Sequence, residues 1–125
     1  MKTITKHYID GAFVESQGRE VINSINPSNG KVIARTLLGD EEDARRAIAA
    51  AKRAFADFSR TTKEERANVL RRLHEIVAAR IDDLTATMVE EYGGTARFSE
   101  LMVRSAADSF LQAEKALQQL PLVRT

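Results

Sequence analysis

The spacing of apolar residues changes once along this chain, close to Asp40. Before that point, short apolar runs alternate with polar residues and with Gly, Pro, Asn and Asp, which is the pattern of strands and turns. After it, apolar residues recur every three or four positions, as they do on one face of an α-helix. The pattern therefore predicts strands over residues 1–39 and helices over residues 40–120.

The first part is expected to contain a β-hairpin followed by further strands. Asp10 and Gly11 stand between short apolar runs, and both tolerate the positive φ angles of a type I′ hairpin turn. Further turns are expected at residues 16–19 and from Pro27 to Gly30, because these stretches are rich in turn-forming residues. The segments that these turns separate are residues 8–14, 21–25 and 31–38.

The first predicted helix begins after Asp40, whose carboxylate can accept hydrogen bonds from the free backbone N–H groups of the first turn. The acidic residues at 41–43 suit the positive end of the helix dipole. Small and large apolar residues alternate along one face, and the alanines indicate close approach to a neighbour. This face consists of Ala44, Ile48, Ala51, Phe55 and Phe58.

Two longer helices are predicted to follow. The first of these opens at Thr62, which has capping-box spacing to Glu65, and continues to an αL stop at the glycines of 93–94. The last helix runs from 96 to 119, and Pro121 prevents its continuation. The apolar stripes of these two helices are Leu70, Leu73, Val77, Ile81, Leu84 and Met88, and then Met102, Ala106, Phe110, Ala113, Leu117 and Leu120.

Length and composition narrow the functional classes. A chain of 125 residues fits one domain, and its 19 basic and 18 acidic side chains leave a net charge of +1. That balance gives no reason to expect a nucleic acid or an anionic membrane as partner. The chain has no cysteine, which excludes disulfides, thiolate metal sites and a thiol nucleophile. With no signal peptide and no membrane-spanning run, a cytoplasmic protein is expected.

The remaining candidate residues form no recognised catalytic pattern. His7 and His74 have no metal-ligand spacing to another His, Cys or acid, so structural or surface roles are expected. The serines lie outside any G-x-S-x-G motif, and the paired acids are typical of solvated helix faces. No glycine-rich phosphate loop follows a strand. The residues by themselves predict no catalytic and no cofactor-binding residue in this chain.

Several segments, taken in order, resemble the aldehyde dehydrogenase superfamily. Residues 8–14 resemble the family's "Y-I-[ND]-G-x-[WF]-V" opening, and residues 25–33 resemble its "x-N-P-[SA]-[TN]-G-x-x-I" turn. Residues 40–55 are similar to its "D-x-x-A-[IV]-x-A-A-x-x-A-F" helix, and residues 66–73 follow the rhythm "R-x-x-x-L-x-x-[LI]". The family commonly has Trp where this chain has Phe58, and "E-x-G-K-P" where it has 91–95, which bears on the subfamily and the substrate.

The resemblance implies an α/β parent fold with a Rossmann-type cofactor domain, of which residues 1–125 would be the N-terminal part. This part would be mostly α-helical, with strands over 1–39 and three helices over 40–120. The parent would oxidise an aldehyde to a carboxylic acid with NAD or NADP, through a thioester on a cysteine. The catalytic and oligomerisation regions would lie outside this chain. The chain alone is therefore expected to be inactive and to bind no NAD or NADP.

Two further expectations follow from the same resemblance. Some family members hold a structural monovalent cation through backbone carbonyls, and the matching positions here are Ile25 and Glu91. Family members are usually oligomers, so a homo-oligomer, or self-association through exposed apolar helix faces, is expected. Two alternatives stay open: a stand-alone helical interaction module, and an independent enzyme of another class, which the missing motifs disfavour.

Overall fold

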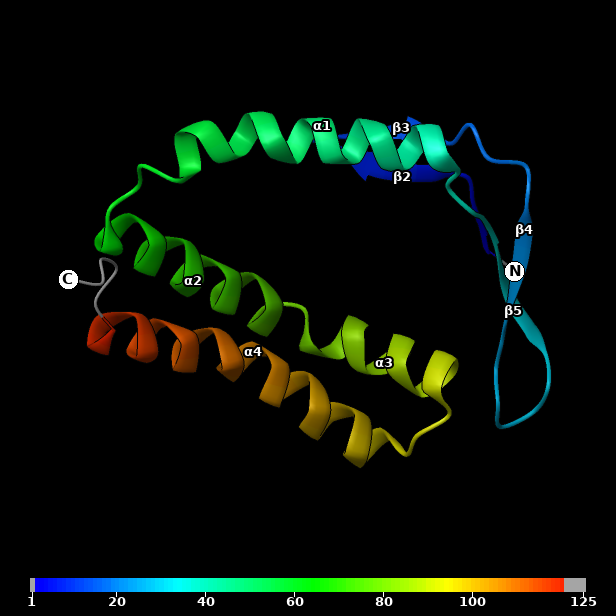
Figure 1. The fold of residues 1–125 in the computed structure, drawn as a ribbon. Coiled ribbons are helices and arrows are strands. Elements are labelled where there is room, and N and C mark those ends of the chain that lie inside the picture. The colour runs from blue at the N-terminus through cyan, green and yellow to red at the C-terminus, as the bar shows by residue number, and fades with distance from the viewer. Residues whose placement is uncertain (1, 121–125) are drawn as a thin grey trace. The chain divides into compact units, whose positions relative to one another are not determined.

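The computed structural model describes residues 2–120, which form five strands and four helices. The chain divides into two compact units, residues 1–60 and residues 61–125. The first unit holds all the described strands and helix α1 (Glu41–Phe58), and the second holds the other described helices (Figure 1). The predicted class, mostly helical with strands at the N-terminus, is confirmed.

The β-hairpin forms where the sequence predicts it. Strands β2 (Lys6–Ile9) and β3 (Ala12–Glu15) pair antiparallel, and His7 lies opposite Val14. Asp10 and Gly11 have φ angles of 56° and 79°, as a type I′ turn requires.

A second small sheet has the strand order β1-β5-β4. Strands β4 (Val21–Ile25) and β5 (Val32–Leu37) pair antiparallel around the predicted Pro-Ser-Asn-Gly turn. Strand β1 (Lys2–Ile4) joins β5 in parallel, and the sequence did not predict it. Its three residues are all exposed, so they are too few and too polar to give a periodic signal.

Helix α1 is capped as predicted but its apolar face is not covered. Asp40 and Asp43 form a reciprocal capping box at its start. Only Asp43 and Ala50 of this helix are buried, whereas Ile48 and Phe55 are each 67% exposed. The face that the alternating pattern assigned to a close neighbour is therefore open to solvent in the described structure.

The second unit contains one more helix than predicted. The segment expected to be one helix from Thr62 to the glycines at 93–94 is two helices, α2 (Lys63–Ala78) and α3 (Ile81–Tyr92). Both pack against the 24-residue helix α4 (Ala96–Gln119), which runs beside them (Figure 1). The apolar spacing continues unchanged through the break at residues 79–80, so periodicity could not reveal it. The capping box at Thr62 and the αL stop at Gly93 are confirmed.

The buried face of α4 also differs from the predicted stripe. Its buried residues are Ser99, Val103 and Ala107, which lie about one residue further round the helix than the predicted set. Small side chains there let α4 approach its neighbours closely. Ala67 of α2, another small residue, is 0% exposed. The larger Met102 stays partly exposed instead. Pro121, expected to end this helix, lies outside the described residues.

The described core consists mainly of small residues. The buried apolar residues are Ala34, Ala50, Ala67, Val103 and Ala107, whereas many large apolar side chains are exposed. A core of this kind buries little apolar area, and that area is the main source of folding free energy. Among the described residues, no helix is long and apolar enough to cross a membrane.

Candidate functional site

The most highly connected polar group in the first unit is the carboxylate of Asp43. Its Oδ2 atom accepts hydrogen bonds from Ser16 Oγ at 2.6 Å, from the backbone N–H of Gln17 at 3.0 Å and from that of Asp40 at 3.2 Å. Arg46 Nη1 lies 3.5 Å from the other oxygen. The side chain is almost fully enclosed, with the residue only 4% exposed. One carboxylate thus joins the loop after β3 to the start of α1.

Ser16 extends this network to the end of β5. Its Oγ lies 3.1 Å from the carbonyl oxygen of Leu38 and accepts a hydrogen bond from the backbone N–H of Gly18 at 3.0 Å. The hydroxyl has a single proton, and the shorter distance to a charged acceptor assigns it to Asp43. The donated proton holds the pKa of the Asp43 carboxyl below its usual value, more than enclosure raises it.

This arrangement lacks the order of a nucleophilic triad. In such a triad a histidine stands between the hydroxyl and the carboxylate. Here Ser16 bonds directly to Asp43, and His7 Nε2 is enclosed with no hydrogen-bond partner among the described residues. His7 lines an open hollow together with Asp40 and Asp43 but completes no relay between them. Its contacts hold the loop after β3, the end of β5 and the start of α1 together.

His74, the second histidine, also has a structural position. Its Nδ1 atom lies 2.9 Å from the carbonyl oxygen of Ala107 and 4.0 Å from a carboxylate oxygen of Asp108. A ring N–H donated to that carbonyl links α2 to α4. The sequence predicted a structural or surface position for His74, and in the structure its ring lies at the contact between α2 and α4.

The two residues assigned to a cation lie in different units. Ile25 is the last residue of β4 in the first unit, and Glu91 is the penultimate residue of α3 in the second. Across residues 2–120, no three His, Asp or Glu side chains gather closely enough to hold a metal ion. The expected site uses backbone carbonyls, which that observation does not test, and it stays a prediction.

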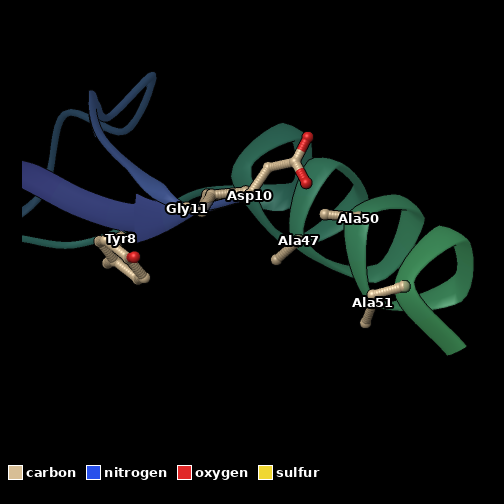
Figure 2. A pocket seen from close by; sticks show the side chains of 8 residues that line it. Tyr8, Asp10, Gly11, Ala47, Ala50 and Ala51 are labelled. Carbon is tan, nitrogen blue, oxygen red and sulfur yellow. The ribbon is translucent and has the colours of Figure 1, made fainter. Parts of the chain in front are cut away.

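A hollow of about 340 Å³ lies between the hairpin turn and α1. Tyr8 and Asp10 reach it from the hairpin, and Ala47, Ala50 and Ala51 come from successive turns of α1 (Figure 2). Its walls are mostly apolar, and its charged member, Asp10, is paired with Arg53 of α1 at 2.8 Å. The hollow can receive an apolar side chain but offers no reacting group.

Comparison with known proteins gives these features a context. The pattern that defines the aldehyde dehydrogenase family matches residues 13–122. Lactaldehyde dehydrogenase of Escherichia coli is 39% identical over 101 residues, which is 81% of this chain and 21% of that protein.

Two solved structures share the fold. The crystal structure of an aldehyde dehydrogenase from Bartonella henselae has a TM-score of 0.92, with 26% identity, over 99% of this chain and 27% of that one. Aldehyde dehydrogenase C of Pseudomonas syringae, solved as a mutant in complex with NAD⁺ and octanal, has a TM-score of 0.90 with 32% identity, over 97% of this chain and 25% of that one.

The fold and the matched sequence are those of an oxidoreductase family. The chain belongs to the aldehyde dehydrogenase family. It spans about a quarter of the length of the relatives it matches, consistent with the N-terminal segment that its motifs indicated.

Proposed function

We propose that this chain is the N-terminal framework of the cofactor-binding domain of an aldehyde dehydrogenase. The whole parent would oxidise an aldehyde to a carboxylic acid with NAD or NADP, through a cysteine thioester formed outside these residues. The proposal rests on one observation. Almost the whole chain matches aldehyde dehydrogenases, and the match covers about a quarter of the length of those proteins. The NAD⁺ and octanal bound in the Pseudomonas syringae structure support the cofactor and substrate class of the parent.

On this proposal the 125-residue chain has no dehydrogenase activity of its own. Thioester formation needs a thiolate, and the chain contains no cysteine. The test is a spectrophotometric assay of the purified chain with short and long aldehydes and with either NAD⁺ or NADP⁺. Escherichia coli lactaldehyde dehydrogenase serves as the positive control. NADH or NADPH formation proportional to the concentration of the chain would contradict the proposal.

The same framework role includes a structural cation held by the backbone carbonyls of Ile25 and Glu91. Carbonyl oxygens suit hard cations, and both positions match the family's cation-binding segments. The test compares the melting temperature of the assembled parent protein in potassium, sodium and choline chloride at equal ionic strength. Equal melting temperatures in the three salts would remove this part of the proposal.

The alternative is a stand-alone helical interaction or structural module without enzymatic activity. The two proposals differ in what the purified chain should do alone. A monodisperse monomer that binds no hydrophobic dye would favour the module, because a self-sufficient domain hides most of its large apolar groups. We also propose a cytoplasmic location, which cell fractionation tests.

A further inference from the structure

Two asparagine side chains fold back over the connection between β4 and β5. Asn26 Oδ1 accepts a hydrogen bond from the backbone N–H of Ser28 at 2.8 Å. Asn29 Oδ1 accepts one from the backbone N–H of Lys31 at 2.9 Å. In both cases the donor lies two residues further along, so each side-chain amide bends toward the peptide bond that follows its own residue. Asn29 is exposed, and the connection projects beyond the paired strands (Figure 1).

These two asparagines differ in the residue that follows them. Asn26 precedes Pro27, whose nitrogen carries no proton and so cannot become a nucleophile by losing one. Asn29 precedes Gly30, whose nitrogen carries a proton and whose missing side chain leaves space beside it. A Cβ atom added at Gly30 would meet nothing within 4 Å, so no neighbouring residue fills that space. Of the two amides, only that of Asn29 is therefore followed by a nitrogen that can attack it.

From this arrangement we propose that Asn29 is a site of spontaneous deamidation. The Gly30 nitrogen gives its proton to a solvent base and forms a bond to Asn29 Cγ. The bond from Cγ to Nδ2 breaks, ammonia departs, and a succinimide ring is formed. Water then opens the ring at one of its two carbonyl groups, which gives either aspartate or isoaspartate. No oxidant or reductant takes part, and the modification does not rest on the proposed function.

The turn itself assists the attack. Negative charge develops on Asn29 Oδ1 as the new bond to Cγ forms, and the Lys31 N–H already donates to that oxygen. A donor fixed where charge develops stabilises the transition state. The Gly30 N–H donates to the carbonyl oxygen of Asn26 at 2.9 Å, and this hydrogen bond has to break first. Because Gly30 is exposed, water can replace the lost partner, and breaking the bond costs little.

Deamidation changes the turn in two ways. A carboxylate replaces a neutral amide, which adds one negative charge to a chain whose formal net charge is +1. Isoaspartate also inserts a methylene group into the backbone between Asn26 and Lys31, whose N–H and carbonyl groups are joined at 2.8 Å. The longer backbone strains this hydrogen bond and the adjoining pair of Ile25 with Val32. The modified chain should therefore melt at a lower temperature.

The experiment incubates the purified 125-residue chain at physiological temperature in mildly alkaline buffer and follows it by peptide mass spectrometry. Trypsin releases residues 20–31 as one peptide with asparagines at 23, 26 and 29, so fragment-ion masses are needed to locate the change. Asn29 should gain about 1 Da per event, and part of the product should be isoaspartate. The modified fraction at Asn29 should exceed that at each of the other three asparagines by about tenfold.

Two glycine variants test the role of the attacking nitrogen. Gly30→Ala places a methyl group beside that nitrogen and should lower the rate at Asn29 by about tenfold. Gly11→Ala is the matched control, because Gly11 also has a positive φ angle and nothing within 4 Å of an added Cβ atom. The control should leave the rate at Asn29 unchanged. In the unaltered chain the rate should rise with pH, because the attack requires a nitrogen that has lost its proton.

Three results would overturn the inference. Asn29 could stay intact in the folded chain and change only in urea, which would show that the folded turn prevents the attack. Aspartate without isoaspartate would exclude the ring, since only ring opening gives both products. Equal rates for Gly30→Ala and the unaltered chain would exclude the Gly30 nitrogen. The comparison among the asparagines uses the unaltered chain, so it decides the question even if Gly30→Ala does not fold.

Discussion

Ser16 and Asp43, separated by 27 residues, are joined by a 2.6 Å hydrogen bond that fixes the loop after β3 to the first turn of α1. The same carboxylate belongs to the capping box with Asp40. Asp43 therefore takes part both in the local capping box and in the long-range hydrogen bond to Ser16. We therefore expect the stability of the first unit to depend on the charge of the Asp43 carboxylate.

Stability of the first unit should fall as the Asp43 carboxyl becomes protonated. The hydrogen bond from Ser16, then the N–H groups of Asp40 and Gln17 and the Arg46 guanidinium, lower its pKa from the ordinary value of 3.8. A group with a lowered folded-state pKa stabilises the fold above its unfolded pKa, and loses that contribution as the pH falls through the folded pKa. We expect the melting temperature to decrease below about pH 4, measured by circular dichroism.

The Ser16→Ala variant identifies this hydrogen bond as the cause. It should melt at a lower temperature than the unaltered chain at pH 7. The difference should narrow as the pH falls below 3.8 and then through the lowered pKa of the folded unaltered chain, because the carboxylate that accepts the Ser16 hydrogen bond becomes protonated. Ser105→Ala, at an exposed position of α4, is the control and should show no pH-dependent difference. A Ser16→Ala difference that stays constant with pH would assign the effect to packing instead.

Gly18, in the same loop, lies close to the backbone of Leu38. A Cβ atom at this position would lie 2.0 Å from the carbonyl oxygen of Leu38, so the backbone must move to accept any side chain. We expect Gly18→Ala to lower the free energy of unfolding by roughly 1–3 kcal/mol, measured by urea denaturation.

Gly39→Ala provides the matched control for that substitution. A Cβ atom there would meet the side chain of Asp43 at 3.4 Å, which is an ordinary contact. The stability of this variant should therefore change little. If Gly18→Ala lowers the free energy of unfolding no more than Gly39→Ala does, the loop accepts the added methyl group by shifting.

The successes and failures of the sequence-based expectations have a common physical origin. The hairpin turn at Asp10 and the caps at Asp40 and Thr62 were predictable because each depends on residues within a few positions. The break at residues 79–80 was not, because it depends on how two helices meet α4. Local patterns report local geometry, and long-range packing overrides them without leaving a trace in the spacing.

The candidate sites illustrate the same limit. Asp43 was recognised only as an acidic residue in a first helical turn, and no local signal connects it to Ser16. The buried face of α4 differs from the predicted one for a similar reason. Apolar residues cover a wide arc of this helix, and the contacts with α2 and α3 determine that Val103 and Ala107 are buried. The apolar face of α1 was predictable as a face, but its spacing does not report that Ile48 and Phe55 are exposed.

Close helix packing in the second unit depends on the small size of Ala107. This residue is 2% exposed, and its carbonyl oxygen accepts the hydrogen bond from His74. Ala107→Leu would force α2 and α4 apart, and we expect it to lower the free energy of unfolding by roughly 1–3 kcal/mol. Ala116→Leu, at an exposed position of the same helix, should change stability by less than about 0.5 kcal/mol. Urea denaturation followed by circular dichroism measures both variants, and equal losses would contradict the packing argument.

The isolated chain should associate with itself as its concentration rises. Ile48, Phe55 and other large apolar side chains are exposed, and burying them against another copy is favourable in water. Static light scattering coupled to size-exclusion chromatography should show an apparent mass that increases with loading concentration. The Ile48→Asp and Phe55→Asp double variant should shift the elution toward the mass of one chain, whereas Lys52→Asp with Ala56→Asp, at exposed positions on another side of the same helix, should not. A mass of 13.9 kDa at every loading concentration of the unaltered chain would show that its exposed faces do not drive association.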